Sequence, residues 1–156
     1  MENKYTREYP VKVEQIKNGF TLNYNIREVS ESELLELWEG SGRAELEGSL
    51  PSADFVAEHK YAYNAVTVPM GQWNYGGIVS AIIREKYKVD EMESITNNVT
   101  AVVSEFFEIL VLDGIIQATR FLSESFKEGL NTTDFNAMQE WRAMAKREAK
   151  SVLKNG

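Results

Sequence analysis

The chain has 156 residues, the usual length of one domain, and 43% of them are hydrophobic, which is enough to form a core. It contains no cysteine and one histidine, which excludes disulfide scaffolds, thiol catalysis and every metal site that uses cysteine ligands. The net charge of −7 argues against a nucleic-acid partner, because binding to DNA or RNA requires clustered cations that neutralise phosphates.

The first third of the chain predicts a small antiparallel sheet. In residues 20–26, apolar side chains alternate with polar ones, which is the period of a strand with one buried face. Asn18-Gly19 separates this run from an apolar run over residues 11–16, and such a pair is typical of a type I′ hairpin turn. A third strand is predicted over residues 61–68, followed by Pro69.

A short helix and a loop are predicted between the hairpin and the third strand. Ser30 and Glu33 form a capping-box pattern, which predicts a helix that ends at the Gly-Ser-Gly of residues 40–42. Residues 40–60 contain Gly48, Pro51 and scattered charges, so we expect them to be an exposed loop.

The second half of the chain predicts helices. Asn74 is expected to cap a helix that runs to about Tyr87, and Asp90 is expected to cap the next one. Residues 99–116 form the longest apolar stretch, but acidic residues interrupt it before it reaches the uncharged span of about 20 residues that a membrane helix needs. We therefore expect a core segment and no membrane partner. Within residues 99–122, Asp113-Gly114 is compatible with a β-hairpin, although we favour helices on both sides of Gly114.

The last helix closes the chain and carries most of its clustered positive charge. Thr132 or Thr133 is expected to cap it, and apolar residues then recur every three or four positions from Phe135 to Val152. Residues 142–154 include five basic residues and one acidic residue, whereas residues 31–58 include eight acidic residues and one basic residue. These opposite patches are either solvated surfaces or surfaces that meet, within the protein or between copies of it.

Candidate catalytic residues are few. Without cysteine, His59 cannot complete a usual zinc site, and no serine near it lies on a nucleophile elbow, so we expect a surface histidine. Glu105 and Glu108 could divide acid and base roles, although a place on an exposed helix edge is the preferred interpretation. The glycines of residues 71–77 match neither a P-loop nor a dinucleotide fingerprint. We expect no enzymatic activity, no metal and no cofactor.

Aromatic residues surround those glycines. We expect the glycines to allow tight backbone packing that lets Trp73 and Tyr75 dock beneath the sheet. The alternative is a rim for a small ligand or glycan, formed by Trp73 and Tyr75 with strand aromatics such as Tyr61 and Tyr63.

Several segments carry a resemblance to a known group of proteins. These are Trp73-Asn74-Tyr75-Gly76 with residues 78–84, Tyr87 and 90–92, the hairpin segment 19–24, and the closing-helix segment 135–142. Over about half of the chain, this pattern resembles small uncharacterised proteins that phages and prophages of gut bacteria encode near tail or other virion genes. The resemblance implies an accessory virion or tail-associated component, located in the virion or the bacterial cytoplasm, and it supplies no catalytic residue.

Together, these features predict an α+β fold in a single domain, 1–156, in which residues 1–69 are mainly β and residues 70–156 are helical. We expect a non-enzymatic interaction or structural protein whose partners are other copies of itself or other virion proteins. Residues 99–126 contain more apolar surface than one short helix needs, so we expect part of this surface to pack against such a partner. The candidate interaction surface comprises Phe106, Phe107, Trp73, Tyr75, Arg142 and Lys146.

Overall fold

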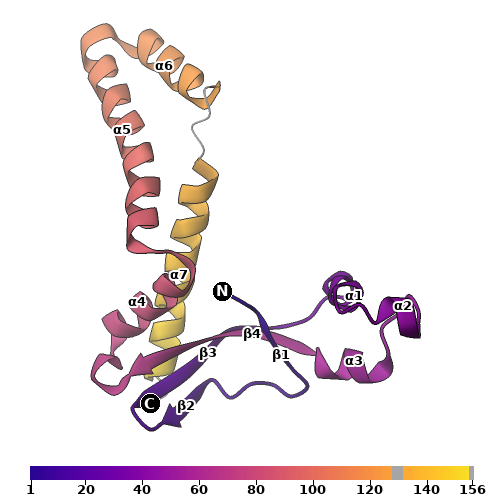
Figure 1. The fold of residues 1–156 in the computed structure, drawn as a ribbon. Helices are drawn as coiled ribbons and strands as arrows, with labels where there is room; N and C mark the ends of the chain where they lie inside the picture. Colours follow the sequence, from indigo (N-terminus) through magenta and orange to yellow (C-terminus); the bar gives the residue numbers. More distant parts are fainter. Residues whose placement is uncertain (128–131, 155–156) are drawn as a thin grey trace. The chain divides into compact units, whose positions relative to one another are not determined.

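The computed structural model describes residues 1–127 and 132–154, which form an α+β fold (Figure 1). The elements in chain order are β1 (Lys4–Thr6), β2 (Val13–Ile16), β3 (Gly19–Glu28), α1 (Glu31–Gly40), α2 (Ala44–Glu47), α3 (Ala53–Glu58), β4 (Tyr61–Pro69), the 3₁₀ helix η1 (Met70–Gln72), α4 (Tyr75–Lys86), α5 (Val89–Asp113), α6 (Ile115–Lys127) and α7 (Thr132–Lys154). They group into two compact units. The first unit is Met1–Ala81 together with the chain from Glu148 onward, and the second is Ile82–Arg147.

The first unit is built on a four-stranded antiparallel sheet with the strand order β1-β4-β3-β2. The predicted hairpin is confirmed as β2 and β3, and the predicted third strand is confirmed as β4. Strand β1 was not predicted, because three residues are too few to show an alternating pattern. It pairs with the edge of β4 and extends the sheet by one strand.

The hairpin turn differs from the predicted one by one residue. Ile16 pairs with Gly19, so Lys17 and Asn18 occupy the centre of the turn, and Gly19 begins β3 without a positive φ. A Cβ atom at Gly19 would overlap the backbone carbonyl oxygen of Val68. This glycine is therefore required for the close approach of β4, and not for a type I′ turn.

Residues 40–60 are more ordered than the predicted loop, because they contain α2 and α3. The side chain of Ser52 accepts a hydrogen bond from the backbone N–H of Phe55 and so caps α3. Phe55 then packs edge-on against Trp38 of α1, with 5.0 Å between the ring centroids. Trp38 is fully buried and donates its indole N–H to the carbonyl of Gly48. A small aromatic cluster therefore orders the segment that was predicted to be exposed.

The helix caps follow the sequence in part. The predicted cap at Ser30 is confirmed, since its hydroxyl accepts from the N–H of Glu33. The cap at Asn74 is also confirmed, by a 2.9 Å bond from the N–H of Gly77. The predicted cap at Asp90 is wrong, because Lys88 precedes α5 and donates its N–H to Glu91.

The core of the first unit lies on one face of the sheet. Its fully buried large side chains include Leu22, Tyr24, Val68 and Ile78. The last turns of α7 belong to this unit, and Ala149 and Val152 are buried there as predicted.

The second unit is helical. Ile82 and Ile83 near the end of α4 are buried, as is Tyr87, which follows the helix. Met138 and Ala145 of α7 are also buried. The indole N–H of Trp141 donates to the carbonyl of Ile82 over 3.1 Å. Helix α7 already includes Thr132 and Thr133, so neither residue is the cap that the sequence predicted.

Helices α5 and α6 pack against each other as a hairpin that turns at Gly114 (Figure 1). Gly114 adopts a φ of +84°, which ends α5, and helices on both sides of it confirm the favoured interpretation over the β-hairpin. The expectation of a core segment is wrong, because α5 contains no buried residue. Its apolar residues lie on all sides of the helix, and α6 covers only one of these sides. Among the described residues, α5 is also the one helix whose length and composition would suffice to cross a membrane.

Candidate functional site

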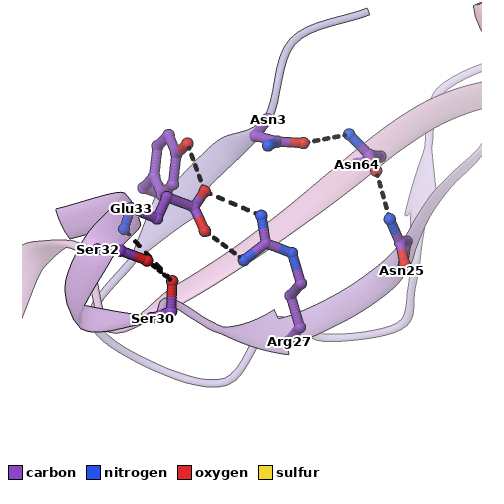
Figure 2. Close-up of polar contacts among 8 residues, drawn as sticks. Asn3, Asn25, Arg27, Ser30, Ser32, Glu33 and Asn64 are labelled. Atoms are coloured by element: carbon purple, nitrogen blue, oxygen red, sulfur yellow. Dashed lines mark hydrogen bonds and ion pairs between the residues drawn. The ribbon is translucent and has the colours of Figure 1, made fainter. Parts of the chain in front are cut away.

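A connected polar network crosses the sheet at a bulge in β3 (Figure 2). The register shifts between Tyr24 and Arg27, and Asn25 there adopts a φ of 54°, a conformation that asparagine tolerates better than most residues. The Asn25 amide donates to the side-chain oxygen of Asn64 over 3.1 Å, and the Asn64 amide donates to the side-chain oxygen of Asn3 over 3.0 Å. Because Asn64 is buried, these bonds satisfy a polar group that would otherwise destabilise the core.

An ion pair next to this network connects β3 to α1 (Figure 2). The guanidinium of Arg27 donates to both carboxylate oxygens of Glu33, over 2.6 and 2.9 Å, and the Tyr5 hydroxyl donates to the same carboxylate over 3.1 Å. The hydrogen bonds from Arg27 hold the pKa of Glu33 below its ordinary value, and Glu33 in turn raises the pKa of Arg27. Burial raises the pKa of Tyr5. Each group is matched by a partner, so this cluster fits a structural role.

A small cavity of about 90 Å³ lies beside the bulge. Lys12 reaches into this region, where its ammonium group contacts the carboxylate of Glu148 at 2.9 Å and the hydroxyl of Ser151 at 3.0 Å. The amide of Asn23 donates to the carbonyl of Val11 over 2.7 Å. The cavity is well below the roughly 300–1,000 Å³ of common ligand pockets, and its charged groups pair with one another. This arrangement fixes the end of α7 to the sheet unit and leaves little room for a ligand.

The second unit has an open acidic hollow of about 410 Å³ near the start of α5. Its lining residues are Tyr87, Asp90, Glu91, Ser94, Ile95 and Asp134. Burial raises the pKa of Tyr87, and the nearby carboxylates of Glu91 and Asp134 raise it further. Among residues 1–127 and 132–154, no three potential ligands are placed so that they could hold a metal ion.

The end of the α5–α6 hairpin exposes an apolar surface, which we call the hairpin apex and define as residues 107–116. Val111, Leu112, Ile115 and Ile116 are 81%, 71%, 70% and 74% exposed, respectively. All four lie within three residues of Asp113-Gly114, so they gather at one place whatever the angle between the helices. A groove of about 430 Å³ continues from the apex, with Ile109, Asp113 and Phe121 among its lining residues. Large apolar residues clustered in this way are typical of an interaction surface.

The candidate interaction residues do not form one surface. Phe107 is exposed on α5, whereas the adjacent Phe106 is half-buried and contacts it edge-on at 5.6 Å between ring centroids. Arg142 and Lys146 are exposed on α7, one helical turn apart. In the described part of the chain, no salt bridge involves either cation.

The two aromatic residues proposed for a glycan rim, Trp73 and Tyr75, differ in their burial. Trp73 is half-buried and packs against Phe20, with 4.5 Å between the ring centroids. Tyr75 is exposed, so the expectation that it docks beneath the sheet is wrong. The tight packing expected of the glycines holds at Gly77, where a Cβ atom would overlap the carbonyl of Gln72. Neither aromatic lines the cavities described above.

The candidate catalytic residues are also separated. Glu105 and Glu108 are both exposed on α5, and neither lines one of the three cavities described above, whereas a two-carboxylate hydrolase requires both acids in one concave pocket. His59 is partly covered, because its ring stacks on Phe55 at 4.0 Å. The Nδ1 atom of His59 lies 2.8 Å from the backbone carbonyl oxygen of Phe55.

Of the apex residues, only Phe107 was named as an interaction residue from the sequence. Residues 109–116 were assigned to the core because they are apolar without interruption except at Asp113 and Gly114. The excess of apolar surface expected over residues 99–126 has the same cause, because apolar residues cover every side of the predicted helix and one neighbouring helix cannot bury them all.

No family model, no curated protein and no solved structure matches the chain.

Proposed function

We propose that this chain is a non-enzymatic structural protein that acts by assembling with other protein chains through the hairpin apex. The observation that carries the proposal is the exposure of Val111, Leu112, Ile115 and Ile116 at one end of α5 and α6. Complete burial of such side chains contributes about 1.5–3 kcal/mol each, so covering the exposed three-quarters of four of them would contribute on the order of 5–9 kcal/mol before the costs of association. A cluster of this size is a driving force for binding.

The remaining chemistry of the chain supports the same proposal. Its carboxylate pairs are exposed or bound to cations. Its two buried amides have hydrogen-bond partners, since Asn64 bonds to Asn3 and Asn25, and Asn23 donates to the carbonyl of Val11. The resemblance to phage-encoded proteins supports a virion as the site of the proposed assembly, with the chain as an accessory or tail-associated component. In that setting, the partners are other copies of the chain or other virion proteins.

A photo-cross-linking experiment tests the proposal directly. Leu112 is replaced by a photo-reactive phenylalanine analogue in the cells that naturally produce the chain, and the cross-linked products are separated by mass. We expect a protein adduct from this position and none from the same analogue at Glu85, an exposed polar position on α4. Adducts with lipid alone, or equal adducts from both positions, would contradict the proposal.

A further inference from the structure

The exposed face of α5 extends from the apex toward the middle of the helix. Phe107 and Val111 of the apex are exposed on this face, and Ser104 and Thr100 continue the same stripe at spacings of three and four residues. None of these four residues is charged, whereas Glu105 and Glu108 lie beside the stripe and are also exposed. This face therefore combines an apolar end with neutral small residues and an acidic border.

Helix α5 and the apex have no positive charge of their own. Residues 89–119 contain six acidic residues, which are Asp90, Glu91, Glu93, Glu105, Glu108 and Asp113, and they contain no lysine, arginine or histidine. Among the described residues, none of these carboxylates takes part in a salt bridge. A partner that covers this face therefore has to supply cations, since uncompensated carboxylates at an interface weaken association.

The same chain carries such cations on the outer face of α7. Arg142, Lys146 and Arg147 are exposed and form no salt bridge with any residue that the structure describes. Ala143 lies exposed among them, so the centre of this face is small and apolar. Arginine and lysine stems also cover apolar surface while their charged ends remain in water. The face is therefore suited to both the acidic border and the apolar end of α5.

We propose that, in the assembly put forward above, the apex and outer face of α5 dock on the Arg142–Arg147 face of α7 in a second copy of this chain. Glu105 and Glu108 are separated by three positions on one helix, and Arg142 and Lys146 by four on the other, so each pair spans one helical turn. Helices packed side by side can then match two carboxylates with two cations, while Phe107 and Val111 cover the stems and Ala143. This inference rests on the proposed function and names its partner.

A lipid bilayer fits the same surface less well. A membrane-spanning α5 would place Glu105 and Glu108 within the hydrocarbon, where charged residues cost about 2.5–3.5 kcal/mol each. A shallow insertion of the apex would still bury Asp113, and the cation nearest to the apex in the sequence, Arg120, lines the groove together with that carboxylate, so a single arginine offers little attraction to anionic headgroups. These charges favour a protein partner with a basic surface.

The proposed interface joins two different faces of the chain, which determines the kind of assembly. Each copy offers one α5 face and one α7 face, so the contact is head-to-tail and produces rings or filaments. A variant that lacks one face can still bind through the other. Two variants with opposite defects should therefore form a dimer that cannot grow.

A mixing experiment tests this arrangement. The first variant carries Phe107→Asp and Val111→Asp, and the second carries Arg142→Glu and Lys146→Glu, with folding checked by circular dichroism. We expect each variant alone to have the monomer mass of 17.8 kDa in light scattering, and an equimolar mixture to give a 1:1 complex of twice that mass. A control with Lys4→Glu and Lys17→Glu, which makes the same change in charge at exposed positions, should assemble like the unaltered chain.

The other outcomes overturn the inference in distinguishable ways. If the Arg142→Glu/Lys146→Glu variant assembles like the unaltered chain, or if the mixture gives no 1:1 complex, the α7 face is not the partner surface, although the proposed function stands. If the chain is monomeric at every concentration yet cross-links to a different protein from position 112, a second copy is not the partner, although the proposed function stands. A monomer that binds to phosphatidylcholine vesicles and gives only lipid adducts overturns both proposals.

Discussion

Alanine substitutions at the apex and in the core should differ in their effect on the stability of the monomer. Leu112 and Ile116 are 71% and 74% exposed, so folding buries less than a third of each side chain, whereas Met138 is fully buried. Burying a whole side chain contributes about 1.5–3 kcal/mol, so Leu112→Ala with Ile116→Ala should destabilise the monomer by less than about 1.5 kcal/mol. Met138→Ala removes buried methylene and sulfur atoms and should cost about 2–5 kcal/mol.

The effects on association should be the reverse. The exposed parts of Leu112 and Ile116 correspond to about 2–4 kcal/mol of burial that only a partner can provide, which is a roughly 30- to 1,000-fold weaker association. Urea unfolding at low protein concentration gives the monomer stability, and light scattering over a concentration series gives the association. Association also makes the unfolding temperature depend on concentration, and this dependence should disappear in the double variant. If the double variant lowers monomer stability as much as Met138→Ala, the apex is covered within the chain and the reasoning fails.

Two further predictions concern the sheet unit. Gly77→Ala should destabilise the protein by at least about 1 kcal/mol, because its Cβ would overlap the Gln72 carbonyl. A Cβ at Gly76 would contact the side-chain oxygen of Asn74 at an ordinary distance of 3.7 Å, so Gly76→Ala should be neutral or stabilise α4 by up to about 1 kcal/mol. Urea unfolding of both variants checks this, and equal effects would contradict the packing argument. Glu33→Gln should cost about 1 kcal/mol or less at pH 7 by weakening the contact with Arg27. Because the folded state lowers the pKa of Glu33, this stabilisation is present above the ordinary value of 4.5 and is lost as the pH falls through the lower, folded pKa. The difference between variant and unaltered chain should therefore shrink in acid unfolding curves, and a difference that grows below pH 4 would refute the assignment.

The sequence was sufficient for elements that carry their own local signal. The alternation over residues 20–26 identified β3, and the side chains of Ser30 and Asn74 identified two helix starts. Each signal depends on residues that are close in the chain, so contacts with distant residues do not change the element that it predicts.

The elements that the sequence did not reveal depend on partners distant in the chain. Strand β1 exists because β4 offers it an unpaired edge, and α3 is ordered because Phe55 reaches Trp38. Gly19 was assigned to a turn, since its contact with Val68 lies in a strand that comes almost fifty residues later.

The candidate interaction residues also divide into those that local sequence signals reveal and those that depend on distant contacts. Charge and apolar excess are visible in the sequence, so Phe107, Arg142 and Lys146 could be named as candidate interaction residues, and the structure shows that all three are exposed. The sequence indicated an excess of apolar surface over residues 99–126, but it did not locate the apex, because an apolar run does not say how many neighbours cover each part of it. Among the described elements, α5 makes extensive contacts only with α6, and this arrangement shows that one side of the helix remains open.

The mass of the unaltered chain in solution tests the central claim most directly. Sedimentation velocity over a hundredfold range of concentration, at low and high salt, measures both self-association and its charge dependence. We expect species larger than 17.8 kDa that increase with concentration and decrease when salt screens the carboxylates of α5. A single 17.8 kDa species under all conditions would contradict assembly between copies of this chain.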